Sequence, residues 1–69
     1  MTVTGLVEPG VESGCLLLRT DTQAYLLVGG DRSVMSSGAR LTVRGYPNPQ
    51  LMGFCMQGEP FEVIEAHPA

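Results

Sequence analysis

The sequence lacks tryptophan and lysine altogether, and it has one histidine and two cysteines among its 69 residues. Its four basic residues are all arginine and face seven acidic ones, which gives a net charge of −3. An acidic chain gains little from releasing phosphate counterions, so general nucleic-acid binding is disfavoured. No apolar run approaches the ~18 residues that a membrane-spanning helix needs.

The first five residues carry no basic residue and no apolar run of the kind that marks a secretory signal. We therefore expect a soluble, cytoplasmic protein. A chain of 69 residues has room for one domain, residues 1–69. A hydrophobic content of 43% indicates a folded domain, and nine glycines and five prolines fit a chain that turns often.

The stretch 38–46 alternates polar and apolar residues and has glycine near both ends. This period of two predicts a half-buried β-strand with Leu41 and Val43 on its inner face and the arginines of the stretch on its outer face. Four further strands are predicted at residues 2–8, 14–20, 24–28 and 61–66. The short polar link before Ala24 makes the second and third strands a hairpin.

Smaller features complete this outline. Gly5, inside the first strand, marks a bend or a close backbone approach. In the last strand Phe61 and Val63 are the expected core residues, Ile64 is partly covered, and the tail 67–69 is frayed. Residues 51–57 form an extended arm or a short strand.

One helical turn is expected between the third and fourth strands. Asp31 is a suitable N-cap for a turn over residues 32–35, which is too short to stand as a helix alone. We expect Val34 and Met35 to point inward and plug one end of a barrel. The predicted fold is all-β: a small five-stranded OB-like antiparallel barrel with this short turn between strands three and four.

Four segments in this order resemble a small bacterial OB-fold-like domain of uncharacterised function. The resemblance rests on Val3-x-Gly5-x-Val7-Glu8, Gly14-Cys15-Leu16-Leu17-Leu18, Tyr25-Leu26-Leu27 and Ser37-Gly38-Ala39-Arg40-Leu41-Thr42-Val43-Arg44-Gly45. It implies binding of an oligonucleotide or oligosaccharide on the face of strands two and three and on the adjoining loops. On that face this sequence offers Arg19 and Tyr25 but no row of aromatic and basic residues.

Cys15 and Cys55 are open to three interpretations. In the first interpretation they are free, partly buried thiols, as is usual in the cytosol. In the second they form a disulfide that stabilises a very small domain. In the third, Cys55 joins Met52 and Met56 as ligands of a soft metal such as Cu(I). The spacing carries no strong metal signature. Zinc is disfavoured because Cys15, Cys55 and His67 fall short of four ligands. We expect no resident metal or cofactor.

Catalytic residues are not evident. A nucleophilic cysteine needs a nearby base, and the one histidine, His67, lies in the tail. Glu62 and Glu65 are three residues apart, so on a regular strand they face opposite sides and form no acid–base pair. We therefore expect a protein that is not an enzyme.

Two regions are candidates for binding. Arg40 and Arg44 share an outer face about 13 Å apart, at ~3.3 Å per residue, which suits two phosphate contacts or a solvated face paired with glutamates. The segment 46–56 either covers the barrel end or presents an apolar contact surface, since aromatic residues and methionine are enriched in interfaces. Its candidate contact residues are Tyr46, Leu51, Met52, Phe54 and Met56.

The sequence thus predicts a small non-enzymatic interaction module. Its partner is another protein or a second copy of the chain, bound through the arm 46–56 and the face of strands two and three. The alternative is weak single-stranded nucleic-acid binding by Arg19, Tyr25, Arg40 and Arg44 through backbone contacts and stacking.

Overall fold

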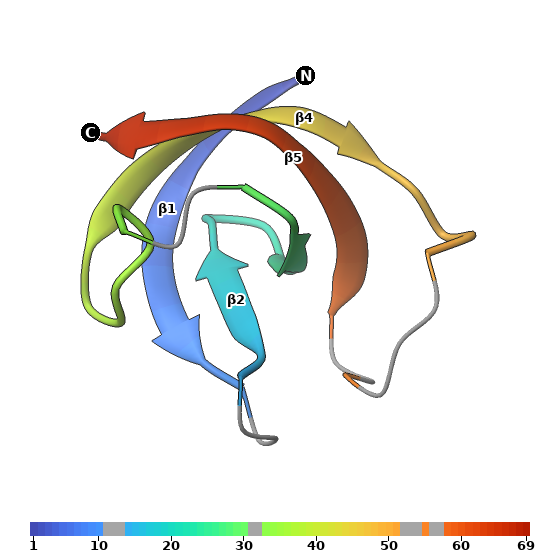
Figure 1. The fold of residues 1–69 in the computed structure, drawn as a ribbon, viewed down its shortest axis with the longest axis horizontal. Coiled ribbons are helices and arrows are strands. Elements are labelled where there is room, and N and C mark those ends of the chain that lie inside the picture. The colour runs from blue at the N-terminus through green and yellow to red at the C-terminus, as the bar shows by residue number, and fades with distance from the viewer. Residues whose placement is uncertain (11–13, 31–32, 52–54, 56–57) are drawn as a thin grey trace.

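The protein is an all-β domain, seen here in a computed structural model that describes residues 1–10, 14–30, 33–51, 55 and 58–69. The prediction of five strands in one small barrel is confirmed (Figure 1). The strands are β1 (Thr2–Pro9), β2 (Leu16–Arg19), β3 (Ala24–Val28), β4 (Arg40–Pro47) and β5 (Glu59–Pro68).

The sheet closes on itself in the order β1-β2-β3-β5-β4, with β4 returning to β1. Four of the five pairs are antiparallel, and β3 and β5 run parallel. The expectation of a purely antiparallel barrel is therefore wrong. The reason is geometric: strand direction cannot alternate all the way around a closed ring with an odd number of members, so a five-stranded barrel contains at least one parallel pair.

No helix occurs in the part of the chain that the structure describes between β3 and β4, so the expected helical turn is not seen there. Its proposed cap, Asp31, lies outside the described residues. Ser36 and Ala39 form a tight turn instead, with the Ala39 amide donating to the Ser36 carbonyl at 3.0 Å. The expected inward position of Met35 is confirmed, since its side chain is buried among the barrel residues.

β1 bends because two strands share it. Its first half pairs with β4 and its second half with β2. At Gly5, between the two halves, a Cβ atom would overlap the backbone carbonyl of Arg19. The close backbone approach expected at Gly5 is confirmed, and glycine is needed there because β1 and β2 cross too tightly for a side chain.

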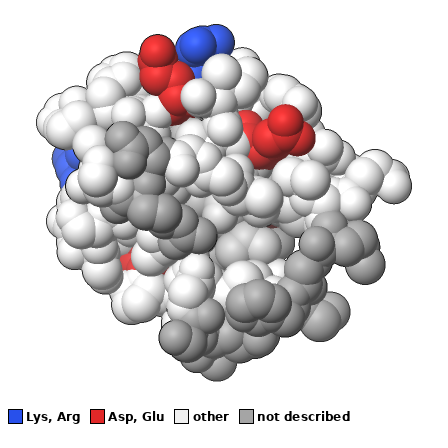
Figure 2. Space-filling view, in the orientation of Figure 1, with Lys and Arg blue, Asp and Glu red and all other residues white. Residues whose placement is uncertain are grey.

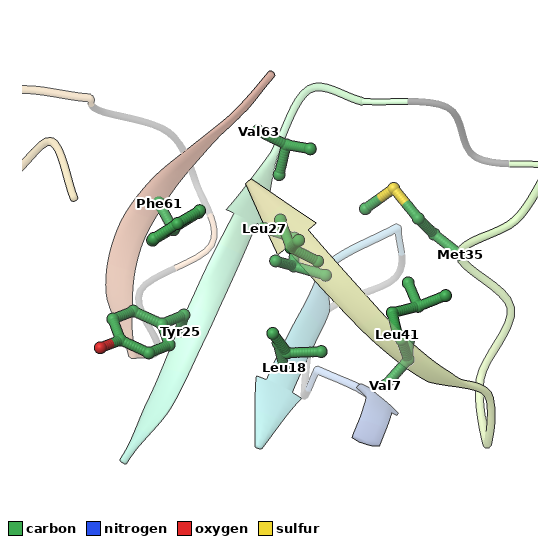
Figure 3. Packing of buried hydrophobic residues seen from close by; sticks show 9 residues of the cluster. Val7, Leu18, Tyr25, Leu27, Met35, Leu41, Phe61 and Val63 are labelled. Atoms are coloured by element: carbon green, nitrogen blue, oxygen red, sulfur yellow. The ribbon is translucent and has the colours of Figure 1, made fainter. Parts of the chain in front are cut away.

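The barrel interior holds one apolar core to which every strand contributes. Figure 3 shows its side chains converging from the surrounding strands, with Met35 reaching in from the connection between β3 and β4. Its buried members are Val7, Leu18, Tyr25, Leu27, Met35, Leu41, Val43, Phe61 and Val63. The inward positions predicted for Leu41, Val43, Phe61 and Val63 are confirmed.

A β-bulge in β5 changes the face on which several side chains lie. Arg44 pairs with Glu65, but the next residue, Gly45, pairs with Val63, so Ile64 is the extra residue. A bulge places two successive residues opposite one and breaks the alternation of faces. Here Ile64 and Glu65 both lie on the outer face, and Ile64 is 55% exposed rather than partly covered.

The bulge also corrects the positions of two glutamates. Glu62 bonds the exposed Tyr46 and Glu65 pairs with the exposed Arg44, so the two carboxylates share the outer face. The expectation that they lie on opposite sides is wrong because the period of two is interrupted between them.

The C-terminal residues are part of the sheet, which corrects the expectation of a frayed tail. Pro68 pairs with Leu41, and the Ala69 amide donates to the Arg40 carbonyl at 2.9 Å. β5 is longer than predicted at both ends, whereas β2 is shorter. Within 51–57, the described residues Leu51 and Cys55 lie outside any strand.

Candidate functional site

The outer face of the β2–β3 hairpin carries a second, smaller apolar cluster. Leu17 and Leu26 pair across the two strands and are buried together with Cys15. A disulfide joins Cys15 to Cys55, with their Cα atoms 5.9 Å apart. Cys55 is partly buried and packs against this cluster, as does Val28. In this structure the part of the β2–β3 face formed by Leu17 and Leu26 is buried, whereas Arg19 on the same face stays exposed.

The disulfide decides among the three interpretations of the cysteines in this structure. Neither sulfur carries a free thiol, so Cys55 has no thiolate to offer a soft metal. Met52 and Met56 lie outside the described residues. Among the described residues, no group of three or more histidine, cysteine, aspartate or glutamate side chains is placed to hold a metal ion.

Three arginines lie on the outer surface of the barrel, spread over β2 and β4. Leu6 of β1 pairs with Arg19 on one side and with Arg40 on the other, so the two arginines flank it in one row. Arg19 donates from Nε to Glu8 Oε1 at 2.9 Å. Arg44 lies 3.7 Å from Glu65. Arg40 makes no ion pair with any residue in the described ranges.

The Glu8–Arg19 pair is close enough to alter both ionisations. The hydrogen bond from Arg19, reinforced by its charge, lowers the pKa of the Glu8 carboxyl. The same bond and the charge of Glu8 raise the pKa of the Arg19 guanidinium. Both side chains remain substantially exposed, so the pair is a surface ion pair that water and salt screen.

Tyr25 is part of the barrel core rather than an exposed platform. Its residue is 4% exposed, and its ring meets Phe61 edge-on at a centroid distance of 5.2 Å. Its hydroxyl accepts a hydrogen bond from Gln23 Nε2 at 2.7 Å. A base cannot stack on a ring that is buried inside the barrel, so Tyr25 offers no stacking surface in this conformation.

Tyr46 is exposed and is held by one carboxylate. Its hydroxyl donates to Glu62 Oε2 at 2.8 Å, and Asn48 Nδ2 donates to Glu62 Oε1 at 3.3 Å. The bond to Glu62 raises the pKa of the Tyr46 phenol, with smaller contributions from desolvation and from the charge of Glu62. Glu62 thus holds the side chains of both Tyr46 and Asn48, the first residue after β4.

Tyr46 and Ile64 are 44% and 55% exposed on neighbouring strands, diagonal to each other beside the bulge. We call the exposed surface of these strands the β4–β5 face; it comprises Arg40, Thr42, Arg44, Tyr46, Glu62, Ile64, Glu65 and His67. In Figure 2 basic and acidic side chains meet at the upper edge of the molecule, where β4 and β5 run in Figure 1.

The remaining predicted contacts lie in the segment that follows β4. Leu51 is partly buried, and its amide donates to the Asn48 carbonyl at 3.0 Å. Met52, Phe54 and Met56 lie outside the described residues. Sequence reasoning missed Glu65 as a member of this face, because only the bulge brings it there and the alternation pattern carries no sign of the bulge. Glu62 and Ile64 alternate with the buried Phe61 and Val63, so regular alternation could have placed both on the outer face.

Comparisons of the chain with protein-family models, with curated proteins and with solved structures found no match. Within the ranges that the structure describes, no helix has the length and apolar character needed to cross a bilayer.

Proposed function

We propose that this protein is a small non-enzymatic interaction module that self-associates through its β4–β5 face. The observation that carries this proposal is the pair of large apolar side chains, Tyr46 and Ile64, exposed at diagonal positions of two neighbouring strands among charged residues. Aromatic and aliphatic centres within polar rims are typical of protein contact surfaces. The covered β2–β3 face leaves no comparable apolar surface on the hairpin.

We further propose that the barrel is of the OB type. Its first strand is shared between β2 and β4, and its fifth strand lies between β3 and β4, which is the strand order of that class. A barrel of this kind implies no chemistry by itself, because one fold supports many functions. The bacterial source implied by the sequence resemblance remains a prediction.

The charges of the β4–β5 face suit a second copy of the same face. Its arginines lie on β4 and its glutamates on β5, so the face has a basic strand and an acidic strand. Two such faces can pack against each other around a two-fold axis that lies in the interface, parallel to the strands and midway between β4 and β5. This axis places β4 of one copy opposite β5 of the other. Arg44 of one copy then faces Glu65 of the other at the same height, as a self-complementary interface requires.

The expected association is weak. A standard interface covers about 800 Å² per partner, roughly a fifth of the 4112 Å² surface of this chain. A contact confined to two strands of a curved barrel falls below that size. We therefore expect a dimer that forms in the micromolar to millimolar range and weakens with added salt.

Sedimentation velocity over a concentration series tests this proposal. The sedimentation coefficient is expected to rise with concentration for the natural chain, and Ile64→Ser is expected to weaken the association at least ~10-fold. Leu6→Ser, which alters an exposed apolar residue on β1, is the matched control and leaves the association unchanged. A chain that stays monomeric throughout, or an association indifferent to Ile64→Ser, contradicts the proposal.

A charge exchange sharpens this test. Arg44→Glu places like charges opposite each other and is expected to abolish the dimer, whereas Arg44→Glu combined with Glu65→Arg restores opposite charges and the dimer with them. If the double variant fails to associate while the natural chain does, the two-fold arrangement is wrong.

A second candidate function rests on Arg40, which is free of ion pairs among the described residues and shares the outer surface with Arg19 and Arg44. Such a surface could contact the backbone of single-stranded nucleic acid. Titration of a fluorescent single-stranded DNA at low and at high salt decides between the candidates. Absence of binding at low salt eliminates the nucleic-acid function, whereas salt-sensitive binding that Arg40→Gln weakens favours it.

The cytoplasmic location expected from the sequence also remains a proposal. The disulfide bears on it, because disulfides persist mainly in oxidising compartments and are rare in the cytosol. The redox state of Cys15 and Cys55 in protein isolated under thiol-trapping conditions tests this location.

A further inference from the structure

The β2–β3 hairpin has one hydrophobic cluster on each face, and only the outer one contains cysteine. Leu18 and Leu27 point into the barrel core. Leu17 and Leu26, each next to one of them in the chain, point outward and are 6% and 7% exposed. Successive residues of a strand face opposite sides of a sheet, so the two clusters share no side chain.

The disulfide lies at the outer cluster and takes no part in the barrel: Cys15 belongs to the cluster and Cys55 packs against it. Cys15 precedes β2 and Cys55 precedes β5, and no strand pair includes either of them. The core of the barrel likewise contains neither cysteine. Breaking the disulfide therefore removes no pair of the barrel sheet and no side chain of the barrel core.

We infer that the Cys15–Cys55 disulfide is a redox-controlled cover, whose reduction exposes Leu17 and Leu26 while the barrel stays folded. The reductant is a dithiol. Cys55 is the more accessible partner, because it is partly buried whereas Cys15 is 4% exposed. A thiolate of the dithiol attacks the sulfur of Cys55, the Cys15–Cys55 bond breaks, and the Cys15 sulfur leaves and takes up a proton.

The second thiol of the reductant then completes the exchange. It attacks the mixed disulfide, Cys55 leaves as a thiolate and is protonated, and the dithiol ends as a disulfide. Two electrons pass from the dithiol to the protein, which ends with two thiols. Cys55 is then no longer tied to Cys15, and the side chains of Leu17 and Leu26 lose their covalent cover.

The test compares thiol accessibility with barrel folding in the same reduced sample. The full chain is reduced with dithiothreitol at low temperature, desalted without oxygen and treated with iodoacetamide, and Cys15 alkylation is followed by mass spectrometry. We expect Cys15 to react within about 10-fold of its rate in the urea-unfolded chain. In a parallel sample, hydrogen exchange at Leu41 and Val43 is expected to stay at least ~10-fold slower than in the urea-unfolded chain, although faster than in the oxidised protein because the reduced chain is less stable.

A matched pair of variants on β3 reports the same event through stability. In the oxidised protein, Leu26→Ala and Leu27→Ala each raise the unfolding equilibrium constant by about 30-fold or more. After reduction the effect of Leu26→Ala is expected to fall below about 5-fold, because its side chain is already exposed, whereas that of Leu27→Ala is unchanged. The double variant Cys15→Ser with Cys55→Ser serves as a reduced form that cannot reoxidise.

Two results overturn the inference. If Leu41 and Val43 lose protection when Cys15 becomes reactive, the disulfide is a staple of the whole fold. If Cys15 stays at least ~100-fold less reactive than in the unfolded chain while the barrel is folded, the cover persists without the covalent bond. The cover also persists without the covalent bond if Leu26→Ala still raises the unfolding equilibrium constant about 30-fold in the double variant Cys15→Ser with Cys55→Ser.

Discussion

Leu17 and Leu18 are consecutive residues of β2, yet they belong to different hydrophobic clusters. Leu18 is fully buried inside the barrel, and Leu17 is buried on the outside beside the Cys15–Cys55 disulfide. A strand of four residues is thus covered on both faces, although the chain has only 69 residues. This arrangement explains the run of three leucines, because a strand with one solvent-exposed face would carry polar residues at alternate positions.

Loss of the disulfide is expected to destabilise the domain by about 4 kcal/mol in the chain-entropy model for two cysteines 40 residues apart. The double variant Cys15→Ala with Cys55→Ala should therefore melt roughly 15–30 °C lower. Scanning calorimetry of the natural and variant chains measures this difference. A melting temperature that does not change would mean that the disulfide contributes nothing to folding.

Alanine at Gly5 or Gly45 is expected to destabilise the barrel by at least about 3 kcal/mol, because a side chain would force two backbones apart. At Gly5 a Cβ atom overlaps the Arg19 carbonyl, and at Gly45 it overlaps the Glu62 carbonyl. Gly38→Ala is the control: its φ of +90° is strained for alanine but its surroundings are open, so about 1–2 kcal/mol is expected. Urea unfolding ranks the three variants.

The ion pair between Glu8 and Arg19 gives stability that depends on pH. Folding lowers the pKa of Glu8, so the unfolded chain binds more protons in this range and stability rises with pH. The contribution is present above the pKa of the unfolded carboxyl and disappears as pH falls through the folded value. NMR titration of the Glu8 carboxyl should return to its ordinary midpoint in Arg19→Gln, whereas Arg40→Gln leaves it low.

The phenol of Tyr46 is expected to titrate above its ordinary range because Glu62 accepts its proton in a hydrogen bond. Glu62→Gln removes the negative charge and should bring the pKa of Tyr46 down. Glu65→Gln, which changes the neighbouring carboxylate paired with Arg44, is the control. NMR spectra of the tyrosine ring recorded against pH give the pKa of Tyr46 in both variants. Equal changes of this pKa in the two variants would contradict the hydrogen bond between Tyr46 and Glu62.

Much of the barrel could be predicted from local patterns. Alternation in 38–46 and the pair Phe61 and Val63 correctly identified inner faces, because an inward side chain in a regular strand recurs every second residue. The glycine in β1 correctly marked a close approach. These predictions succeeded where one residue's surroundings are determined by its own strand.

The features that failed depend on pairing between distant strands. The bulge at Ile64 has no sequence signature in β5 itself, since it arises from the register against Arg44 and Gly45. The parallel pair follows from closing five strands into a ring, which no single strand encodes. Tyr25 was assigned to the wrong environment for the same kind of reason, because alternation in an apolar strand such as Ala24–Val28 does not distinguish its two faces.

The most direct test of the two-cluster arrangement is the intact mass of the full chain, isolated without reductant and treated with iodoacetamide in its folded state. The arrangement predicts a chain that lacks the two thiol hydrogens and takes up no alkyl group until a dithiol is added. A native chain that is alkylated at both Cys15 and Cys55 without reduction would contradict it, because Leu17 and Leu26 would then have no covalent cover to lose.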